Sequence, residues 1–382
     1  MIVETLSRYS PKMGGQTVII YIALPFIYTL ATIVDKPISK KLGRRNWTFV
    51  LLFPLFLMTA FRSVSVGSDT ATYEKFYEFF SQQPLVMGYH FGMEFGYRFV
   101  NKLFGCLGIG FVGFQIVYSA FIYLSIGNFV SRYSGNLAFS VLFFVTFRLF
   151  FFALTGIRQM IAMAIILNST RHIENRKWIR YLMNIIIASS FHRTASVLIA
   201  LYFVPFQALD LKNIFKIIAI SIPSLIGIEF ILQLFVSIFP KYSTYLARIE
   251  SYDGTFVFVQ LIVVMIFMML GIYLDNTACG IKRDRQSRPS KSAIDEIALS
   301  AVTYSFIFSL FGTYINIAGR ISKYFIMYLM VFLPNYLSKA RDYRIRKIVY
   351  YCLVLLLFVY YFVILYMRPE WDGVIPFRWM WN

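Results

Sequence analysis

The chain has 382 residues, of which 59% are hydrophobic and 14% are charged, and its formal net charge is +19. Soluble domains carry about 25% charged residues, so the composition excludes an ordinary soluble domain and predicts a polytopic membrane protein. The positive charge does not indicate nucleic acid as a partner, because the basic residues are confined to short loops between apolar runs.

Apolar runs long enough to cross a bilayer recur along the whole chain. A helix needs roughly 17–25 apolar residues to span a hydrocarbon core of about 30 Å. We therefore predict an all-α fold with about twelve transmembrane helices, some of them short or broken, and we treat residues 1–382 as a single transmembrane domain. In chain order the predicted spans are 17–35, 47–61, 109–131, 137–155, 157–173, 179–191, 194–207, 213–236, 257–274, 297–316, 320–338 and 348–367.

Basic segments separate several of these spans. With the spans above, all of them fall on one side of the membrane, and both termini fall on the other. The positive-inside rule makes the basic side cytoplasmic. The segments are residues 35–45, Arg132, and residues 171–180, 282–291 and 339–347.

The opposite, outward-facing side collects polar, aromatic and charged residues. It receives a loop and helix region at about 61–108 and several short junctions. An active site needs convergent polar groups, and this side offers them, so we expect the function to face outward. The junctions are residues 155–159, 191–195, 237–256, 318–324 and the C-terminal residues 368–382.

The stretch "FRSVSVGSDTATYEKFYEFF" (residues 61–80) brings Arg62, Asp69 and Tyr73 close to the end of a span. The Gly-Ser-Asp triplet that ends at Asp69 is typical of a turn that starts a helix, with the serine or Asp69 as N-cap. Asp69 and Tyr73 are four residues apart and would share a helix face. Asp69 is therefore either a helix cap or a carboxylate that binds or deprotonates a hydroxyl-rich substrate.

Arg148 and Arg158 lie in or beside the two consecutive predicted spans 137–155 and 157–173. Arg158 and Gln159 stand at the outer end of the predicted helix 157–173. Ionisable groups in spanning segments are costly and are functional candidates, and arginine has the planar fork of donors that suits a phosphate. The alternative for Arg158 is a side chain that snorkels to the interface. Arg148 lies deeper, and we expect it to point into the bundle, either to a carboxylate or into the same site.

A similar arrangement occurs at Arg320, Lys323 and Tyr324, which are spaced i, i+3 and i+4 and would share one helix face. Helix N-termini attract anions through unpaired N–H groups and the helix dipole. Arg158 and Arg320 would each stand at an outer helix N-terminus. Together they form either a pyrophosphate clamp or a pair of interface anchors.

His192 and Arg193 lie between two apolar segments of half the usual spanning length. Broken helices at membrane depth are tolerated where they line a cavity or are buried in protein. His192 is therefore either a general base or a structural histidine that braces the break. In the outer region, Glu94 and Arg98 are four residues apart, a spacing that favours an ion pair.

Metal and cofactor chemistry is not indicated. The chain has three cysteines and three histidines, all scattered, which predicts neither a disulfide framework nor a metal site. The sequence also lacks a phosphate-binding glycine loop. We expect no metal and no cofactor.

Six stretches follow one another in a fixed order from about residue 50 to the C-terminus: "FRSVSVGSDTATYEKFY", "EFGYRFVNKLF", "GIRQMIAMAI", "NRKWIRYLMNIIIASSFHRTA", "GRISKYF" and "GVIPFRW". In order and spacing this series resembles the EpsG/Wzy-type polymerases of bacterial surface polysaccharides. No single stretch is specific, and the ordered series carries the resemblance.

The resemblance implies a GT-C-like membrane glycosyltransferase. It would join oligosaccharide repeat units carried on undecaprenyl diphosphate, at the outer face of the bacterial cytoplasmic membrane. Donor and acceptor would both be lipid-linked, and undecaprenyl diphosphate would leave when an acceptor hydroxyl attacks the anomeric carbon of the donor. A chain-length regulator and a flippase of the same pathway are implied as protein partners.

The resemblance gives the candidate residues roles. Arg158 and Arg320 would stabilise the anionic leaving group, with Lys323 in support. Asp69 or His192 would activate the acceptor hydroxyl, and the sequence leaves that choice open. The other substrate-binding candidates are Arg62, Tyr73, Arg148, Gln159, Arg193 and Tyr324.

Three other classes of membrane protein compete with this interpretation. A flippase or transporter of lipid-linked oligosaccharide would bind the same anionic lipid, but it should carry charges through the depth of the membrane and on both sides. A membrane O-acyltransferase would also use a histidine, but its acyl donor comes from the cytoplasmic side. A glycan ligase would share the donor and differ only in its acceptor.

Overall fold

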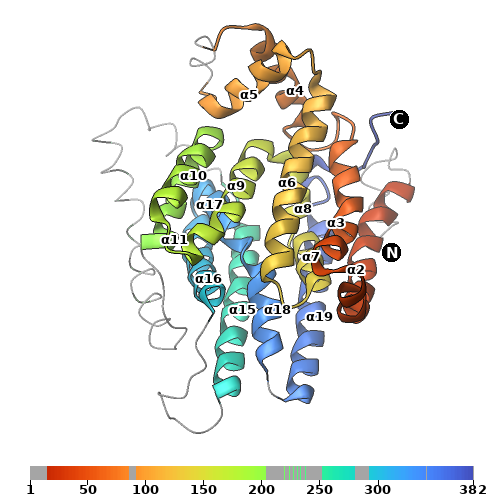
Figure 1. Ribbon diagram of the computed structural model, residues 1–382, viewed down its shortest axis with the longest axis vertical. Helices are drawn as coiled ribbons and strands as arrows, with labels where there is room; N and C mark the ends of the chain where they lie inside the picture. Colours follow the sequence, from red (N-terminus) through yellow and green to blue (C-terminus); the bar gives the residue numbers. More distant parts are fainter. Residues whose placement is uncertain are drawn as a thin grey trace. The chain divides into compact units, whose positions relative to one another are not determined.

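The computed structural model describes residues 15–85, 92–203, 252–279, 292–340 and 342–381, together with six single residues between 219 and 237 (Figure 1). The chain divides into two compact units. Unit 1 contains residues 1–202 and 350–382, and unit 2 contains residues 203–349. The predicted single domain stays a prediction.

Unit 1 is built from helices that run between its two ends. Figure 1 shows α4 and α5 at the end where α6 and α9 begin. Its elements are α2 (Gly15–Leu42), α3 (Arg44–Ala60), α4 (Thr70–Gln82), α5 (Phe95–Cys106), α6 (Phe111–Tyr133), α7 (Leu137–Thr146), α8 (Leu149–Thr155), α9 (Ile157–Glu174), α10 (Trp178–Phe191), the 3-10 helix η2 (Arg193–Ile199), α11 (Ala200–Phe203), most of α19 (Tyr343–Met367) and η5 (Trp371–Gly373).

Unit 2 contains α15 (Thr255–Cys279), α16 (Ala293–Gly312), α17 (Asn316–Ile326) and α18 (Leu329–Lys339). The Gln260 amide of α15 donates to the hydroxyls of Ser309 on α16 (3.0 Å) and Ser322 on α17 (3.1 Å), so one side chain links three helices. Such hydrogen bonds hold helices together where water is excluded. At the end of unit 2 where α16 begins, Lys339 pairs with Asp295 (2.8 Å).

The helices confirm an all-α polytopic membrane protein. Within the described residues, five helices are long and apolar enough to cross a membrane, and the number rises to seven if two bent pairs count as one span each. The pairs are α7 with α8, bent by 60°, and α17 with α18, bent by 47°. The other predicted spans fall on shorter or more polar helices, such as α3, α9 and α10, and the span 213–236 lies outside the described residues apart from single positions.

The surface of unit 1 fits a lipid environment. The large apolar side chains of Leu30 and Ile33 on α2 are 64% and 71% exposed, and Leu355 on α19 is 65% exposed. In water an exposed apolar surface of this kind would promote aggregation. In the hydrocarbon of a bilayer it is stable, provided that the backbone N–H and C=O groups are hydrogen-bonded within the helix.

Three basic segments meet at one end of unit 1, which we call the basic end: residues 35–45, Arg132 and residues 171–180. The Arg44 side chain donates to the carbonyl of Ser131 (3.0 Å), and Arg132 pairs with Glu174 (3.1 Å). These contacts confirm that these basic segments share one side. The segment 282–291 lies outside the described residues.

A buried aspartate joins the helices at the basic end. Asp35 is 5% exposed, and its carboxylate accepts hydrogen bonds from the Trp47 indole (2.9 Å) and from the backbone N–H groups of Leu137 (3.1 Å) and Ala138 (3.0 Å). It therefore satisfies the unpaired N–H groups at the start of α7. In the sequence Asp35 only opens a basic loop, and nothing local indicates this role.

Replacement of Asp35 by alanine tests the cap. Asp35→Ala leaves three buried donors without an acceptor, and each costs about 1–3 kcal/mol, so we expect a loss of roughly 3 kcal/mol in unfolding free energy. The measurement is thermal unfolding of the purified protein in detergent, with the neighbouring exposed Lys36→Ala as control, for which we expect a change within about 0.5 kcal/mol. Equal melting temperatures for the two variants would contradict the assignment.

Candidate functional site

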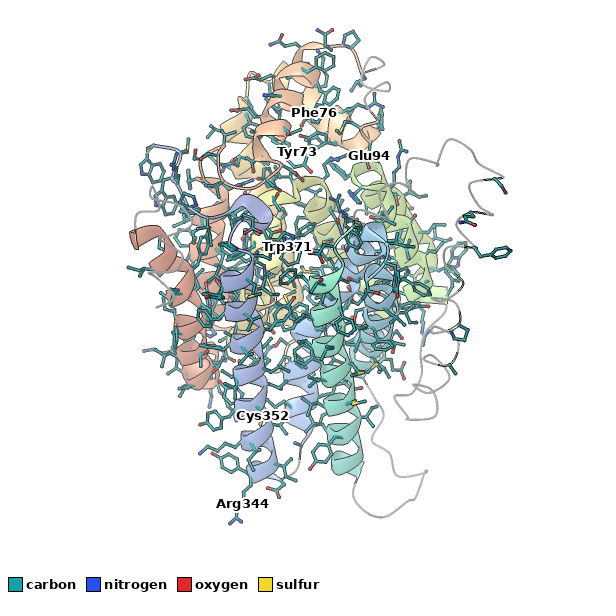
Figure 2. The ribbon with its side chains drawn as sticks, turned by 180° about the vertical axis from the view of Figure 1, so that it is seen from behind. Tyr73, Phe76, Glu94, Arg344, Cys352 and Trp371 are labelled. Atoms are coloured by element: carbon teal, nitrogen blue, oxygen red, sulfur yellow. The ribbon has the colours of Figure 1, made fainter. Side chains whose placement is uncertain are left out.

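Five separate segments meet at the end of unit 1 opposite the basic end. We call this the polar end: residues 61–70, residues 92–97, the junctions around Arg158 and His192, and the tail 368–381. The Ser68 and Thr155 hydroxyls are hydrogen-bonded (2.7 Å), and the Arg193 N–H donates to the Glu94 carboxylate (3.4 Å). Figure 2 shows Tyr73, Glu94 and Trp371 toward this end and Cys352 toward the other.

The C-terminal tail holds the 61–70 loop in place through backbone hydrogen bonds. The loop requires a glycine at position 67, because the φ of Gly67 is +96° and an added Cβ would lie 2.3 Å from the carbonyl oxygen of Leu154. The bonds join Ser63 N to Arg378 O (2.8 Å), Met380 N to Phe61 O (2.9 Å), Gly67 N to Gly373 O (2.8 Å) and Ser68 N to Asp372 O (2.8 Å).

Arg148 anchors this tail. It sits in a left-handed conformation (φ 60°) at the break between α7 and α8, is 6% exposed, and donates to the Asp372 carboxylate (2.7 Å) and the Trp371 carbonyl (3.2 Å). Its guanidinium lies over the Phe151 ring (4.6 Å) and the Trp371 ring (5.4 Å). Of the two expected destinations for Arg148, the structure shows the carboxylate. Asp372 was not among the predicted site residues.

Arg62 is enclosed by protein. It is 1% exposed and donates to the Thr59 carbonyl and to the Tyr118 hydroxyl (2.6 Å). The Gln115 amide donates to the Arg62 carbonyl (2.9 Å). These contacts brace the end of α3 and offer no open surface, so the geometry favours a positioning role for Arg62 over contact with a substrate.

A further charged group of the polar end, partly accessible, is centred on Arg158. Its guanidinium pairs with the Glu94 carboxylate, and the two side chains are 20% and 10% exposed. The Tyr73 and Tyr97 ring centres lie 5.8 Å and 5.9 Å from the guanidinium carbon, which suits cation–π contact. We call Arg158, Glu94, Tyr73 and Tyr97 the Arg158 cluster.

The predicted ion pair between Glu94 and Arg98 is wrong. Glu94 occupies the N-cap position of α5 without a side-chain cap bond and reaches Arg158, whereas Arg98 donates to the Leu85 carbonyl. A partly buried arginine on another helix outweighs a local i, i+4 pair, because that pair is worth only about 0.2–0.5 kcal/mol.

Tyr73 keeps its proton at neutral pH. Burial raises the pKa of its hydroxyl above the ordinary value, and the positive charge of Arg158 opposes that rise. Tyr73 therefore offers the site a neutral hydroxyl and an aromatic face, and Glu94 supplies the negative charge that the arginine requires.

Asp69 stands at the N-cap position of α4, as expected, but its side chain makes no cap hydrogen bond. Its backbone N–H donates to the Thr155 hydroxyl (3.3 Å), and the side chain is exposed. Tyr73, one turn later, is buried at 6% exposure. The capping alternative for the Asp69 carboxylate is therefore not supported, and the carboxylate faces solvent at the polar end.

The predicted break around His192 is confirmed. Helix α10 ends at Phe191, and a 3-10 helix starts at Arg193. The His192 Nδ1 lies 2.6 Å from the Thr194 hydroxyl, and the Arg193 side chain is exposed. Gln159, next to Arg158, is buried at 3% exposure.

The third group of predicted residues belongs to unit 2. Helix α17 begins at Asn316, so Arg320 lies about one turn inside the helix and not at the start of a span at residue 320. Arg320 is exposed, Lys323 is half-buried and Tyr324 is 2% exposed. Arg158 and Arg320 belong to different units, and the clamp between them stays a prediction.

The fold and the site define an all-α polytopic membrane protein. At one end of unit 1 it has a partly accessible arginine, Arg158, that is paired with a carboxylate. The sequence model of the EpsG family matches residues 45–379, which is most of the chain, and the chain therefore belongs to the EpsG family. This confirms the resemblance and supports a function of the polysaccharide-polymerase type. No curated protein and no solved structure matches the chain.

Removal of the Asp372 carboxylate tests whether its pair with Arg148 holds the C-terminal tail at the polar end. Asp372→Asn leaves the Arg148 charge buried without a counter-ion, which costs about 3–5 kcal/mol in comparable cases. We expect a lower melting temperature and faster proteolysis of the tail 368–381.

The matched control is Glu370→Gln on the same tail. Glu370 pairs with Arg368 at 3.7 Å, and both side chains are largely exposed (67% and 42%), so this change should cost about 0–1 kcal/mol. If Asp372→Asn behaves like Glu370→Gln in both assays, Arg148 and Asp372 do not anchor the tail.

Proposed function

We propose that the chain is a repeat-unit polymerase of a bacterial surface polysaccharide. It joins oligosaccharides linked to undecaprenyl diphosphate at the outer face of the cytoplasmic membrane. The donor's anomeric carbon is attacked by a hydroxyl of the acceptor repeat unit, and undecaprenyl diphosphate leaves.

The observation that carries the proposal is the Arg158 cluster. Arg158 is the second residue of α9, an 18-residue helix whose N-terminus is at the polar end. A helix N-terminus and an arginine fork both favour a phosphate anion. Transition-state charge that develops on the diphosphate would be stabilised where fixed donors already point.

The expected orientation comes from the charge distribution. The positive-inside rule places the basic end in the cytoplasm, so the polar end faces outward, where lipid-linked repeat units would be joined. The chain's apolar surface keeps it in the bilayer that carries both substrates. A flippase and a chain-length regulator of the same pathway are the proposed protein partners.

The other candidate residues take supporting roles in this proposal. Arg193 and Gln159 flank Arg158 at the polar end, and Asp69 and His192 are the groups predicted from sequence to activate the acceptor hydroxyl. Arg320, Lys323 and Tyr324 are proposed to contact the substrate from α17.

The deciding experiment supplies the purified protein, in lipid nanodiscs, with a lipid-linked repeat unit. A ladder of longer lipid-linked glycans supports a polymerase. Transfer of one glycan to an unrelated acceptor would indicate a ligase. Movement of intact substrate across the bilayer of a proteoliposome, without any new glycosidic bond, would indicate a flippase.

Arginine variants test the leaving-group role. Removal of one group that stabilises developing negative charge costs about 10²–10³ in rate, so we expect Arg158→Ala and Arg320→Ala to lose glycan extension by that factor while each protein stays in the membrane. Arg158→Lys should be intermediate, because lysine keeps the charge and loses the fork.

Arg132→Ala is the matched control, because Arg132 is an exposed arginine of the basic end. Glycan chain length and rate are measured on gels for all variants at equal protein amount. Wild-type products from both Arg158→Ala and Arg320→Ala would rule out the arginines as leaving-group ligands.

A further inference from the structure

We infer that Glu94 occupies the position on Arg158 that the substrate's diphosphate takes when it binds. Once the diphosphate has displaced it, Glu94 acts as the general base that deprotonates the acceptor hydroxyl. This inference rests on the proposed function. It assigns the base to a residue that the sequence predicted only as half of a local ion pair.

The contact between Arg158 and Glu94 already joins an arginine to an anion. Arginine binds carboxylates and phosphates through the same planar fork of N–H groups. The Glu94 carboxylate therefore occupies the position that an anionic ligand of Arg158 would take. The two residues are 64 apart in the chain and come from α5 and α9, so the pair is a product of the fold and not of local sequence.

The pair is open to exchange. The Arg158 side chain is 20% exposed against 6% for Arg148, whereas the two paired carboxylates differ little, with Glu94 at 10% and Asp372 at 13%. Glu94 makes no cap bond to α5, so its carboxylate is held by Arg158 and by the Arg193 N–H. A diphosphate carries more negative charge than a carboxylate and offers more acceptor oxygens, so it can replace Glu94 on the guanidinium.

The second contact keeps the displaced carboxylate in the site. Glu94 Oε1 accepts from the Arg193 backbone N–H at 3.4 Å, while Oε2 is the atom on Arg158. Loss of the Arg158 contact frees Oε2 and leaves Oε1 near its backbone donor. A general base needs to lie within hydrogen-bond reach of the proton it takes, and Glu94 would be freed only when donor diphosphate is in place.

The chemical step balances without a cofactor. The acceptor hydroxyl oxygen forms a bond to the anomeric carbon of the donor, and its proton passes to Glu94 Oε2. The bond between the anomeric carbon and the diphosphate oxygen breaks, and its electron pair stays with the diphosphate, which Arg158 holds. Glu94 then releases the proton to water and pairs with Arg158 again when the lipid diphosphate leaves.

The contacts seen for the other two candidates are different. The Asp69 side chain is exposed, and the His192 ring contacts the Thr194 hydroxyl. Glu94 contacts the group that receives the leaving diphosphate, and this couples donor binding to base activation.

The test separates binding from turnover in Glu94→Gln. Binding is measured with radiolabelled farnesyl diphosphate on the full-length protein in nanodiscs, and turnover with the lipid-linked repeat unit. Without a competing carboxylate, we expect farnesyl diphosphate to bind roughly tenfold more tightly. Without the base, we expect turnover to fall by about 10²–10⁴.

Glu78→Gln is the matched control, because Glu78 is an exposed glutamate on the neighbouring outer helix α4, and it should match wild type in both assays. If Glu94→Gln does not reach the membrane folded, Glu94→Asp replaces it. Its shorter side chain weakens the contact with Arg158, so the same two directions are expected with smaller size.

The outcomes distinguish the two proposals. The role of Glu94 is overturned if the Glu94 variant binds farnesyl diphosphate no more tightly than wild type, or if its turnover stays close to wild type. In that case the proposed function still stands, provided that the wild-type protein polymerises the repeat unit. A purely structural Glu94 would lower binding and turnover together. Wild-type protein that extends no glycan overturns the proposed function, and the base role falls with it.

Discussion

A charge that is buried in an apolar helix bundle must have a partner, and this constraint organises both ends of unit 1. An unpaired buried ion costs several kcal/mol. Asp35 is satisfied by the donors at the start of α7, and Arg148 by Asp372. The pair of Arg158 with Glu94 obeys the same rule, but its arginine is more exposed than Arg148, at 20% against 6%, and we propose that a ligand takes the place of its carboxylate. The same need for a partner gives a structural anchor at Arg148 and, in our proposal, a binding site at Arg158.

The anchors place the site. Arg148 in its left-handed conformation breaks the span between α7 and α8 and binds the tail, and the tail in turn binds the 61–70 loop through backbone hydrogen bonds. That loop leads directly into α4, which presents Tyr73 to Arg158. The aromatic wall of the site therefore depends on residues at the far end of the chain, and a polymerase of this design would lose activity through damage to its C-terminus as well as through damage to the arginine.

The helices could be predicted from the sequence, because bilayer thickness imposes a length of apolar run that is visible residue by residue. The break at His192 and the shared side of the three basic segments of unit 1 followed from the same patterns. The pairing of charges could not be predicted, because it joins residues 64 apart for Arg158 with Glu94 and 224 apart for Arg148 with Asp372. The local spacing rule favoured Arg98 for Glu94, and tertiary packing gave Glu94 a partner on another helix.

We propose that the diphosphate of the lipid substrate binds at Arg158, and electron cryomicroscopy of the protein in nanodiscs with a bound isoprenyl diphosphate tests this. We expect density for the diphosphate in contact with the Arg158 guanidinium between Tyr73 and Tyr97, with the Glu94 side chain turned away. Diphosphate density elsewhere, with Glu94 still paired to Arg158, would show that Arg158 does not bind the diphosphate.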